Sequence, residues 1–427
     1  MSQSKVVRNA AWIIACKIVQ AILGVIVTML SARFLGPSGY GIINYAASVV
    51  AFVAPVMQLG LNSTLVQEFI HAPEKEGETL GTALVMSLCS GILCIFGVIA
   101  FSMVANHGEK VTVLVCALYS LLLIFQALEI SQYWYQAKLK SKYTSIVMLL
   151  AYVLISAYRI ILLASGGSIY LFAVSQAIDY MLISVALLVI YNKLGGQKLV
   201  FSFASAKRMF AKSKYYIIPN LMVSIFANTD KVMLQLMLGE ETTGFYSAAL
   251  GSITMTGFVY SAIIDSARPS IFESQKISET NFEKNVIRLY SVIIYLSLLQ
   301  SLLMTIFAPL IIKILYGSQY GPSVNVLRLA VWYTTFAYIG SVRNIWILAK
   351  DKQKYLWILN LSGALMNVVL NFVLIPVLGM SGAALASLLT QIFTNVGMNH
   401  IIKPIRHNNV LMVRSLNPKH VKEMIKK

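Results

Sequence analysis

Long apolar blocks constrain this chain more than any other feature of its sequence. About twelve blocks of roughly 20 residues follow one another, and each could cross a bilayer core of ~30 Å as a helix that rises 1.5 Å per residue. Of the 427 residues, 58% are hydrophobic and 12% are charged, whereas soluble domains are about 25% charged. The sequence therefore predicts an all-α polytopic membrane protein with no room for a second globular domain.

The predicted spans form two sets of six. The first set is 10–32, 41–61, 82–105, 111–130, 144–164 and 169–191, and the second is 215–238, 244–267, 289–315, 324–349, 356–378 and 381–402. The predicted domains are an N-terminal six-helix lobe (1–191), a basic linker (192–214), a C-terminal six-helix lobe (215–402) and a basic tail (403–427).

Basic residues are distributed unevenly among the connections. Twenty-five Lys and Arg fall on one set of connections and the two ends, whereas the alternate connections hold only Arg33 and Lys110. The positive-inside rule predicts that both termini lie in the cytoplasm. Because this asymmetry accounts for the formal net charge of +18, we expect no nucleic-acid partner.

Two motifs recur in the same order in both halves. Residues 35–46 resemble 238–249 at an offset of 203, and residues 137–143 resemble 349–355 at an offset of 212. Because each half has an even number of spans, the halves share one orientation. We therefore expect a parallel pseudo-two-fold repeat with its axis along the membrane normal.

Charged residues inside the apolar blocks are candidates for function, since a charge at mid-span costs about 2.5–3.5 kcal/mol. Seven are basic and four are acidic. Those near a block edge are expected to reach the headgroups: Glu129, Arg268, Lys313 and Arg328. Deeper ones either line a hydrated central cavity or form buried ion pairs: Lys17, Arg159, Asp179, Lys231 and Arg343.

The excess of basic over acidic residues predicts a cationic cavity. Such a cavity suits an anionic substrate, particularly a phosphate or diphosphate. Asp179, Asp230 and Asp265 are candidates for ion coupling. Asn367 and Asn371 share a helical stripe with Asn360, which either lines a polar path or makes hydrogen bonds between helices.

Motifs for enzymatic or metal chemistry are missing from the sequence. It has no Walker A sequence, no HExxH, no CxxC and no spaced His or Cys cluster. We therefore expect neither an enzyme, nor a cofactor, nor a metal site.

Five stretches, taken together, resemble bacterial polysaccharide flippases, the Wzx-type branch of the multidrug, oligosaccharidyl-lipid and polysaccharide exporter superfamily. They are ARFLGPSGYG at 32–41, DKVML at 230–234 with GFYSAA at 244–249, LYG at 315–317, NVVLN at 367–371, and Ile375-Pro376 with Gly379 and GAA at 382–384. The resemblance covers the whole chain and implies a fold like that of multidrug and toxin extrusion (MATE) transporters.

The resemblance also implies a function. Such proteins move an undecaprenyl-diphosphate-linked oligosaccharide, for O-antigen, capsule or exopolysaccharide, from the cytoplasmic to the outer leaflet of the bacterial inner membrane. It implies coupling to H⁺ or Na⁺, contact with membrane lipids, and cooperation with a glycan polymerase or glycosyltransferases. Lys17 and Lys231 become the first candidates for substrate contacts, followed by Arg159 and Arg343.

Two alternatives stay open. One is a cation-coupled drug or metabolite exporter of the same superfamily, although the first three spans carry no Asp or Glu, which drug-exporting relatives often have there. The other is a non-transporting membrane scaffold for glycan assembly.

Overall fold

The computed structural model describes residues 3–417, and within them the side chains of residue 16 and of residues 19–417. Every regular element in the described part is helical. Eight helices are long and apolar enough to cross a membrane, and nine if the bent pair α11 and α12 forms one broken span. The predicted all-α polytopic class is confirmed.

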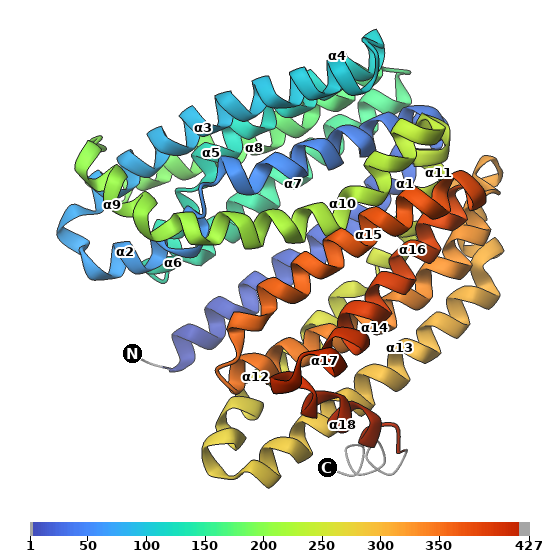
Figure 1. Ribbon diagram of the computed structural model, residues 1–427. Coiled ribbons are helices and arrows are strands. Elements are labelled where there is room, and N and C mark those ends of the chain that lie inside the picture. The colour runs from blue at the N-terminus through green and yellow to red at the C-terminus, as the bar shows by residue number, and fades with distance from the viewer. Residues whose placement is uncertain (1–2, 418–427) are drawn as a thin grey trace. The chain divides into compact units, whose positions relative to one another are not determined.

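The first of two compact units extends to Asn228 (Figure 1). Its helices are α1 (Gln3–Met57), α2 (Leu65–His71), α3 (Glu76–Ala105), α4 (Lys110–Ser120), α5 (Leu122–Glu129), α6 (Gln132–Ala137), α7 (Ser141–Ala164), α8 (Ile169–Lys193) and α9 (Phe203–Ser213). The boundary with the second unit falls inside α10 (Ile217–Leu238).

The second unit begins at Thr229. Its further helices are α11 (Glu240–Thr254), α12 (Gly257–Ile277), α13 (Glu279–Tyr316), α14 (Ser323–Ala349), α15 (Leu356–Leu378), α16 (Met380–Ile392), α17 (Met398–Ile401) and α18 (His407–Arg414). A π-helical turn, Phe393–Gly397, joins α16 to α17. The lobe, linker and tail boundaries drawn from the sequence stay a prediction.

All twelve predicted spans fall on helices, but the chain is divided differently. The first two spans are two helices that meet directly at a kink at Gly36, where the backbone is not helical (φ 67°, ψ 175°), and α1 denotes both. The second predicted span runs past the end of α1 at Met57. A break at Leu121 divides the fourth span into α4 and α5. Glycine with positive φ followed by Pro37 explains why a bend, and not a loop, separates the first two spans.

Left-handed backbone positions recur between the two units. Gly36 and Gly239 (φ 67° and 88°) are 203 residues apart, and Leu139 and Asp351 (φ 56° and 52°) are 212 residues apart. Positive φ is uncommon outside glycine, so its occurrence at two equivalent non-glycine positions is informative. The internal repeat expected from the sequence is therefore present in the backbone.

The turn after the fourth predicted span, residues 137–143 in the first unit and 349–355 in the second, is stabilised in the same way in both units. We call each of these turns a basic turn. In the first unit, Lys138 forms an ion pair with Glu76 at 2.6 Å, and Lys140 lies 5.4 Å from the centre of the Trp134 ring. Both contacts join the turn to neighbouring helices. Glu76 is the first residue of α3, where its charge also favours the helix dipole.

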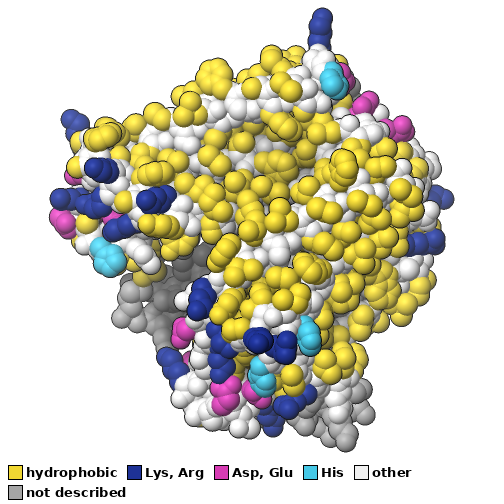
Figure 2. Space-filling view, in the orientation of Figure 1, with side chains coloured by type: hydrophobic (Ala, Val, Ile, Leu, Met, Phe, Trp, Pro, Cys, Tyr) yellow, Lys and Arg dark blue, Asp and Glu magenta, His cyan; other side chains and the backbone are white. Residues whose placement is uncertain are grey.

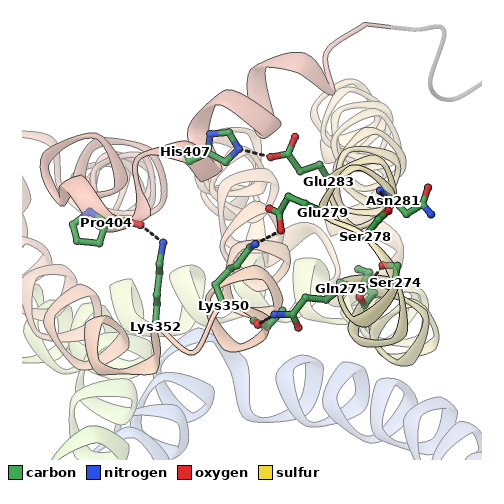
Figure 3. A network of polar contacts seen from close by, with 12 residues as sticks. Ser274, Gln275, Ser278, Glu279, Asn281, Glu283, Lys350, Lys352, Pro404 and His407 are labelled. Atoms are coloured by element: carbon green, nitrogen blue, oxygen red, sulfur yellow. Dashed lines mark hydrogen bonds and ion pairs between the residues drawn. The ribbon is translucent and has the colours of Figure 1, made fainter.

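The basic turn of the second unit repeats these contacts. Lys350 pairs with Glu279, the first residue of α13 (Figure 3). Lys352 lies 4.8 Å from the centre of the Trp346 ring. Lys352 also donates to the backbone oxygen of Pro404. Burial, together with the neighbouring Lys350, lowers the pKa of Lys352.

Apolar side chains cover much of the visible face of each unit, as Figure 2 shows. Leu93 on α3 is 71% exposed and Phe372 on α15 is 69% exposed. Lys and Arg gather over α9 in the first unit and near α18 in the second. An exposed apolar surface with basic residues gathered at an end is typical of a helical membrane protein.

Candidate functional site

A buried carboxylate on α10 accepts four hydrogen bonds within the second unit. Asp230 is 7% exposed. Its Oδ1 accepts from Nδ2 of Asn367 at 3.0 Å and from Nδ2 of Asn371 at 2.7 Å. Its Oδ2 accepts from the Tyr246 hydroxyl at 2.5 Å and from the Ser387 hydroxyl. We call these five residues the Asp230 cluster.

Close packing of α15 against α16 brings three of the four hydrogen-bond donors to the Asp230 carboxylate. Asn367 and Asn371 are one turn apart on α15, so their amides lie on the same face. A Cβ at Gly382 would lie 2.2 Å from the backbone oxygen of Leu374, so only glycine lets α16 approach α15 this closely. Ser387 follows five residues later on α16 and reaches the carboxylate.

Only uncharged groups donate to Asp230. Lys231 is half-buried, and no ion pair joins it to Asp230 in the part of the chain that the structure describes. Oδ1 of Asn371 is buried without a hydrogen-bond partner. Carboxylate, amide and hydroxyl oxygens are the usual ligands of hard cations, and the same carboxylate can instead take up a proton. Asn367 and Asn371 thus make hydrogen bonds between helices, one of the two expectations for their stripe.

Arg343 on α14 is a buried cation held by neutral oxygens. It is 3% exposed, and its Nη1 donates to the backbone oxygen of Thr394 at 2.9 Å. Its Nη2 donates to Oδ1 of Asn344 at 2.9 Å. Thr394 lies in the π-helical turn, and such turns often occur at functional sites. No carboxylate pairs with Arg343 among the described residues, so only neutral oxygens offset its charge there.

Arg159 and Asp179 lie in the core of the first unit. Arg159 is 5% exposed, and its Nε donates to the Ser175 hydroxyl at 2.8 Å. Its guanidinium lies 5.8 Å from the centre of the Phe172 ring. Asp179, one turn after Ser175 on α8, is also buried. Arg159 and Asp179 attract each other, yet in the described chain they form no direct ion pair.

Glu129 lies in the interior of the first unit, which corrects the expectation that it reaches the headgroups. It is 8% exposed and lines a cavity of about 20 Å³ together with Gln58, Ser87, Gln126 and Tyr133. This volume holds about one water molecule. The backbone stays helical from Glu129 through Ser131, and Glu129 lies on a buried face of this helical segment, which its position near a block edge did not reveal.

The other ionisable candidates differ in their surroundings. Asp265 is exposed and pairs with Arg268 at 3.1 Å on the same helix. Lys313 and Arg328 are exposed, in agreement with their expected positions at block edges. The side chain of Lys17 lies outside the described residues.

Comparison with protein families identifies the chain at the level of family. Residues 6–275, more than half of its length, match the model of the polysaccharide biosynthesis protein family. The chain belongs to this family. The resemblance inferred from the five sequence stretches is thereby confirmed.

The chain is also similar in sequence to three individual proteins. The chain is 26% identical over 240 residues to an uncharacterized membrane protein of Methanocaldococcus jannaschii, of which it spans only 46%. It is 21% identical to the "Capsular polysaccharide biosynthesis protein CapF" of Staphylococcus aureus, matching 93% of this chain and 100% of that one. It is 21% identical to the "Putative O-antigen transporter" of Shigella flexneri, matching 89% of this chain and 94% of that one.

Solved structures share the fold at lower sequence identity. The lipid II flippase MurJ in its inward closed conformation matches 95% of this chain and 90% of its own, with a TM-score of 0.76 and 15% identity. An inward-facing MATE family multidrug transporter matches 91% of this chain and 96% of its own, with a TM-score of 0.65 and 13% identity. The expected MATE-like fold is confirmed.

Sequence reasoning missed two members of the Asp230 cluster. Tyr246 lies in a motif that indicated the internal repeat and the family resemblance but no contact with Asp230. Ser387 carries no distinguishing signal, because serine is common in membrane helices. The small residues at 382–384 are the only hint that α16 approaches a neighbouring helix closely enough for a short side chain to reach it.

Proposed function

We propose that this protein moves an oligosaccharide linked to undecaprenyl diphosphate from the cytoplasmic to the outer leaflet of a bacterial inner membrane. The observation that carries this proposal is the nearly full-length match to proteins named for capsular polysaccharide synthesis and O-antigen transport. A fold shared with a lipid II flippase supports it further. The activity is transport, and the passenger undergoes no covalent change.

Buried positive charge supports an anionic passenger. A glycan headgroup cannot enter hydrocarbon without losing its hydrogen bonds to water, so it needs a polar path. Arg159 and Arg343 are buried cations without a directly paired carboxylate in the described chain. We assign them, with Lys17 and Lys231, to contacts with the diphosphate or with acidic sugars during alternating access.

Asp230 is the strongest candidate for ion coupling. Unlike Asp265, it is buried and forms no ion pair among the described residues, and it attracts the adjacent Lys231. Its oxygens and those of its cluster suit H⁺ or Na⁺. Uptake of either cation would neutralise the carboxylate and weaken the four hydrogen bonds that it accepts, which links ion binding to the packing of α10 against α11, α15 and α16.

The proposed membrane placement follows from the charge asymmetry. Both termini lie in the cytoplasm, and glycosyltransferases and a polymerase would act on the same lipid-linked glycan before and after its translocation. The two lobes of the sequence-based division, 1–191 and 215–402, are then the parts that open alternately to each side.

Deletion of the gene tests the proposal. Lipid-linked glycan should accumulate in the inner leaflet, as measured by leaflet-resolved labelling of its sugars in intact and opened cells. Expression of the intact chain should restore labelling at the outer leaflet. An unchanged glycan distribution accompanied by altered drug sensitivity would instead identify a drug exporter with the same fold.

A further inference from the structure

A polar pocket lies near the turn that joins α12 to α13 in the second unit. Its volume is about 320 Å³, and it is lined chiefly by Ser270 and Glu273 on α12 and by Asn281, Lys284, Asn285 and Arg288 on α13. The spacing of the α13 residues puts all four on one face of that helix. The pocket therefore presents two cations, one acid and several hydrogen-bonding groups.

The polar side chains on the two sides of α13 differ in whether they have ion-pair or hydrogen-bond partners. On one side Glu279 pairs with Lys350 and Glu283 pairs with His407, as Figure 3 shows, with Asn281 on the other side of the helix. On the pocket side, the side chains of Asn281, Lys284 and Asn285 have no polar partner among the described residues. These groups are free to bind a ligand.

A second, apolar pocket of about 300 Å³ lies farther along the same two helices. It is lined chiefly by Val259 and Tyr260 on α12 and by Leu296, Leu299, Leu303 and Met304 on α13. Tyr260 is fixed by stacking on Tyr338 at 3.9 Å between ring centres. Leu299 and Leu303 are exposed, so the pocket is accessible from the surface of the unit.

The spacing of the two pockets matches an amphipathic ligand. Leu296 follows Arg288 by eight residues, which is about 12 Å along a helix. A phosphate bound between Lys284 and Arg288 thus lies about two helical turns from the start of the apolar pocket. An acyl chain attached to that phosphate through glycerol spans this distance.

We propose that the α12–α13 pockets bind one anionic phospholipid, with its phosphate at Lys284 and Arg288 and an acyl chain in the apolar pocket. Glu273 and the asparagines accept and donate hydrogen bonds to the hydroxyls of the headgroup. The polar pocket admits a glycerol phosphate, whereas a diphosphate bearing several sugars is far larger. The predicted orientation places this end of the hairpin at the cytoplasmic leaflet. This site is additional to the proposed transport path and does not depend on it.

Photo-crosslinking tests the site directly. The purified full chain is placed in phosphatidylcholine nanodiscs containing a small fraction of phosphatidylglycerol that carries a diazirine in its acyl chain, and labelled peptides are identified by mass spectrometry. Labelling should concentrate at residues 296–304. Lys284→Gln combined with Arg288→Gln should lower it at least about tenfold, because two charge-assisted hydrogen bonds are lost.

Matched controls keep the result interpretable. Lys276→Gln removes an exposed lysine of the same hairpin that does not line the pocket, and labelling should not change. Lys284→Gln alone, at an exposed position, should still lower labelling if the double variant folds poorly. Equal labelling by a phosphatidylcholine probe, or no effect of Lys284→Gln, would overturn the proposal. Displacement by equimolar undecaprenyl phosphate but not by phosphatidylglycerol would overturn the assignment to phospholipid.

Discussion

At the scale of single residues, burial of the Asp230 carboxylate carries a large free-energy cost. An ionised carboxylate inside a membrane bundle is costly, and uncharged donors offset only part of that cost. Four such donors nevertheless converge on it from α11, α15 and α16. A neutral residue of the same shape would be cheaper to bury, and the proposed role in ion coupling would account for the charge.

Replacement of this carboxylate separates stability from function. Asp230→Asn keeps the shape of the side chain and removes the charge. We expect glycan export to fall at least about fivefold, in the range of typical coupling energies, while the amount of protein in the membrane is maintained. Export is measured as outer-leaflet glycan per molecule of protein. Asp265→Asn is the control, since that carboxylate is exposed and pairs only with Arg268 among the described residues. Equal loss of export in both variants would argue against a special role for Asp230.

Residue types and spacing revealed part of this site. Asp230, Asn367 and Asn371 were recognisable because polar residues are rare in apolar blocks and the two asparagines share a helical face. Tyr246 and Ser387 were not recognisable, because their contribution depends on how closely α11 and α16 approach α10. The position of Glu129 was wrong for a similar reason: its place near the block edge suggested exposure, whereas it lies on a face of its helix that tertiary packing buries.

At the scale of elements, the two basic turns make equivalent ion pairs with the start of a neighbouring helix, but the carboxylates of these ion pairs differ in exposure. The Glu76 side chain is 8% exposed and that of Glu279 is 58% exposed, although each begins the helix to which the turn is attached. Burial strengthens a charge-assisted hydrogen bond and raises the cost of leaving one partner alone. Exposed ion pairs contribute little.

Double-mutant cycles measure this difference. For Glu76→Gln with Lys138→Met we expect a coupling of about 1.5–3 kcal/mol in the free energy of unfolding in detergent. For Glu279→Gln with Lys350→Met we expect about 0.2–1 kcal/mol. A larger coupling in the second unit than in the first would contradict the dependence on exposure.

At the scale of the whole molecule, the Asp230 cluster predicts how transport responds to ion gradients. In proteoliposomes with a lipid-linked glycan in the bilayer, an imposed H⁺ or Na⁺ gradient should change the flipping rate of the intact protein. Asp230→Asn should flip at a rate that is independent of the gradient, since its amide neither takes up a proton nor supplies a carboxylate. If the intact protein flips the lipid at the same rate with either gradient as without one, ion coupling is not part of the mechanism.

The fold was largely predictable because apolar block length and helical rise are linked by simple geometry. The all-helical class, the order of the apolar helices and the internal repeat could be read from the sequence, whereas the twelve predicted spans compare with eight or nine helices long and apolar enough to cross a membrane in the described part of the chain. Single-residue breaks such as Leu121, the bend at Gly36 and the π-helical turn at Phe393–Gly397 could not be read in the same way. They depend on tertiary packing, which overrides local preference.

The positive φ angles at Leu139 and Asp351 have an evolutionary consequence. Leucine and aspartate share no chemistry, so selection on the side chain does not explain why the backbone makes the same turn at both. Inheritance from a shorter ancestral gene that was copied and fused end to end does explain it. If each copy crosses the membrane six times, as the sequence predicts, each copy ends on the side where the next begins, so such a fusion requires no additional membrane span.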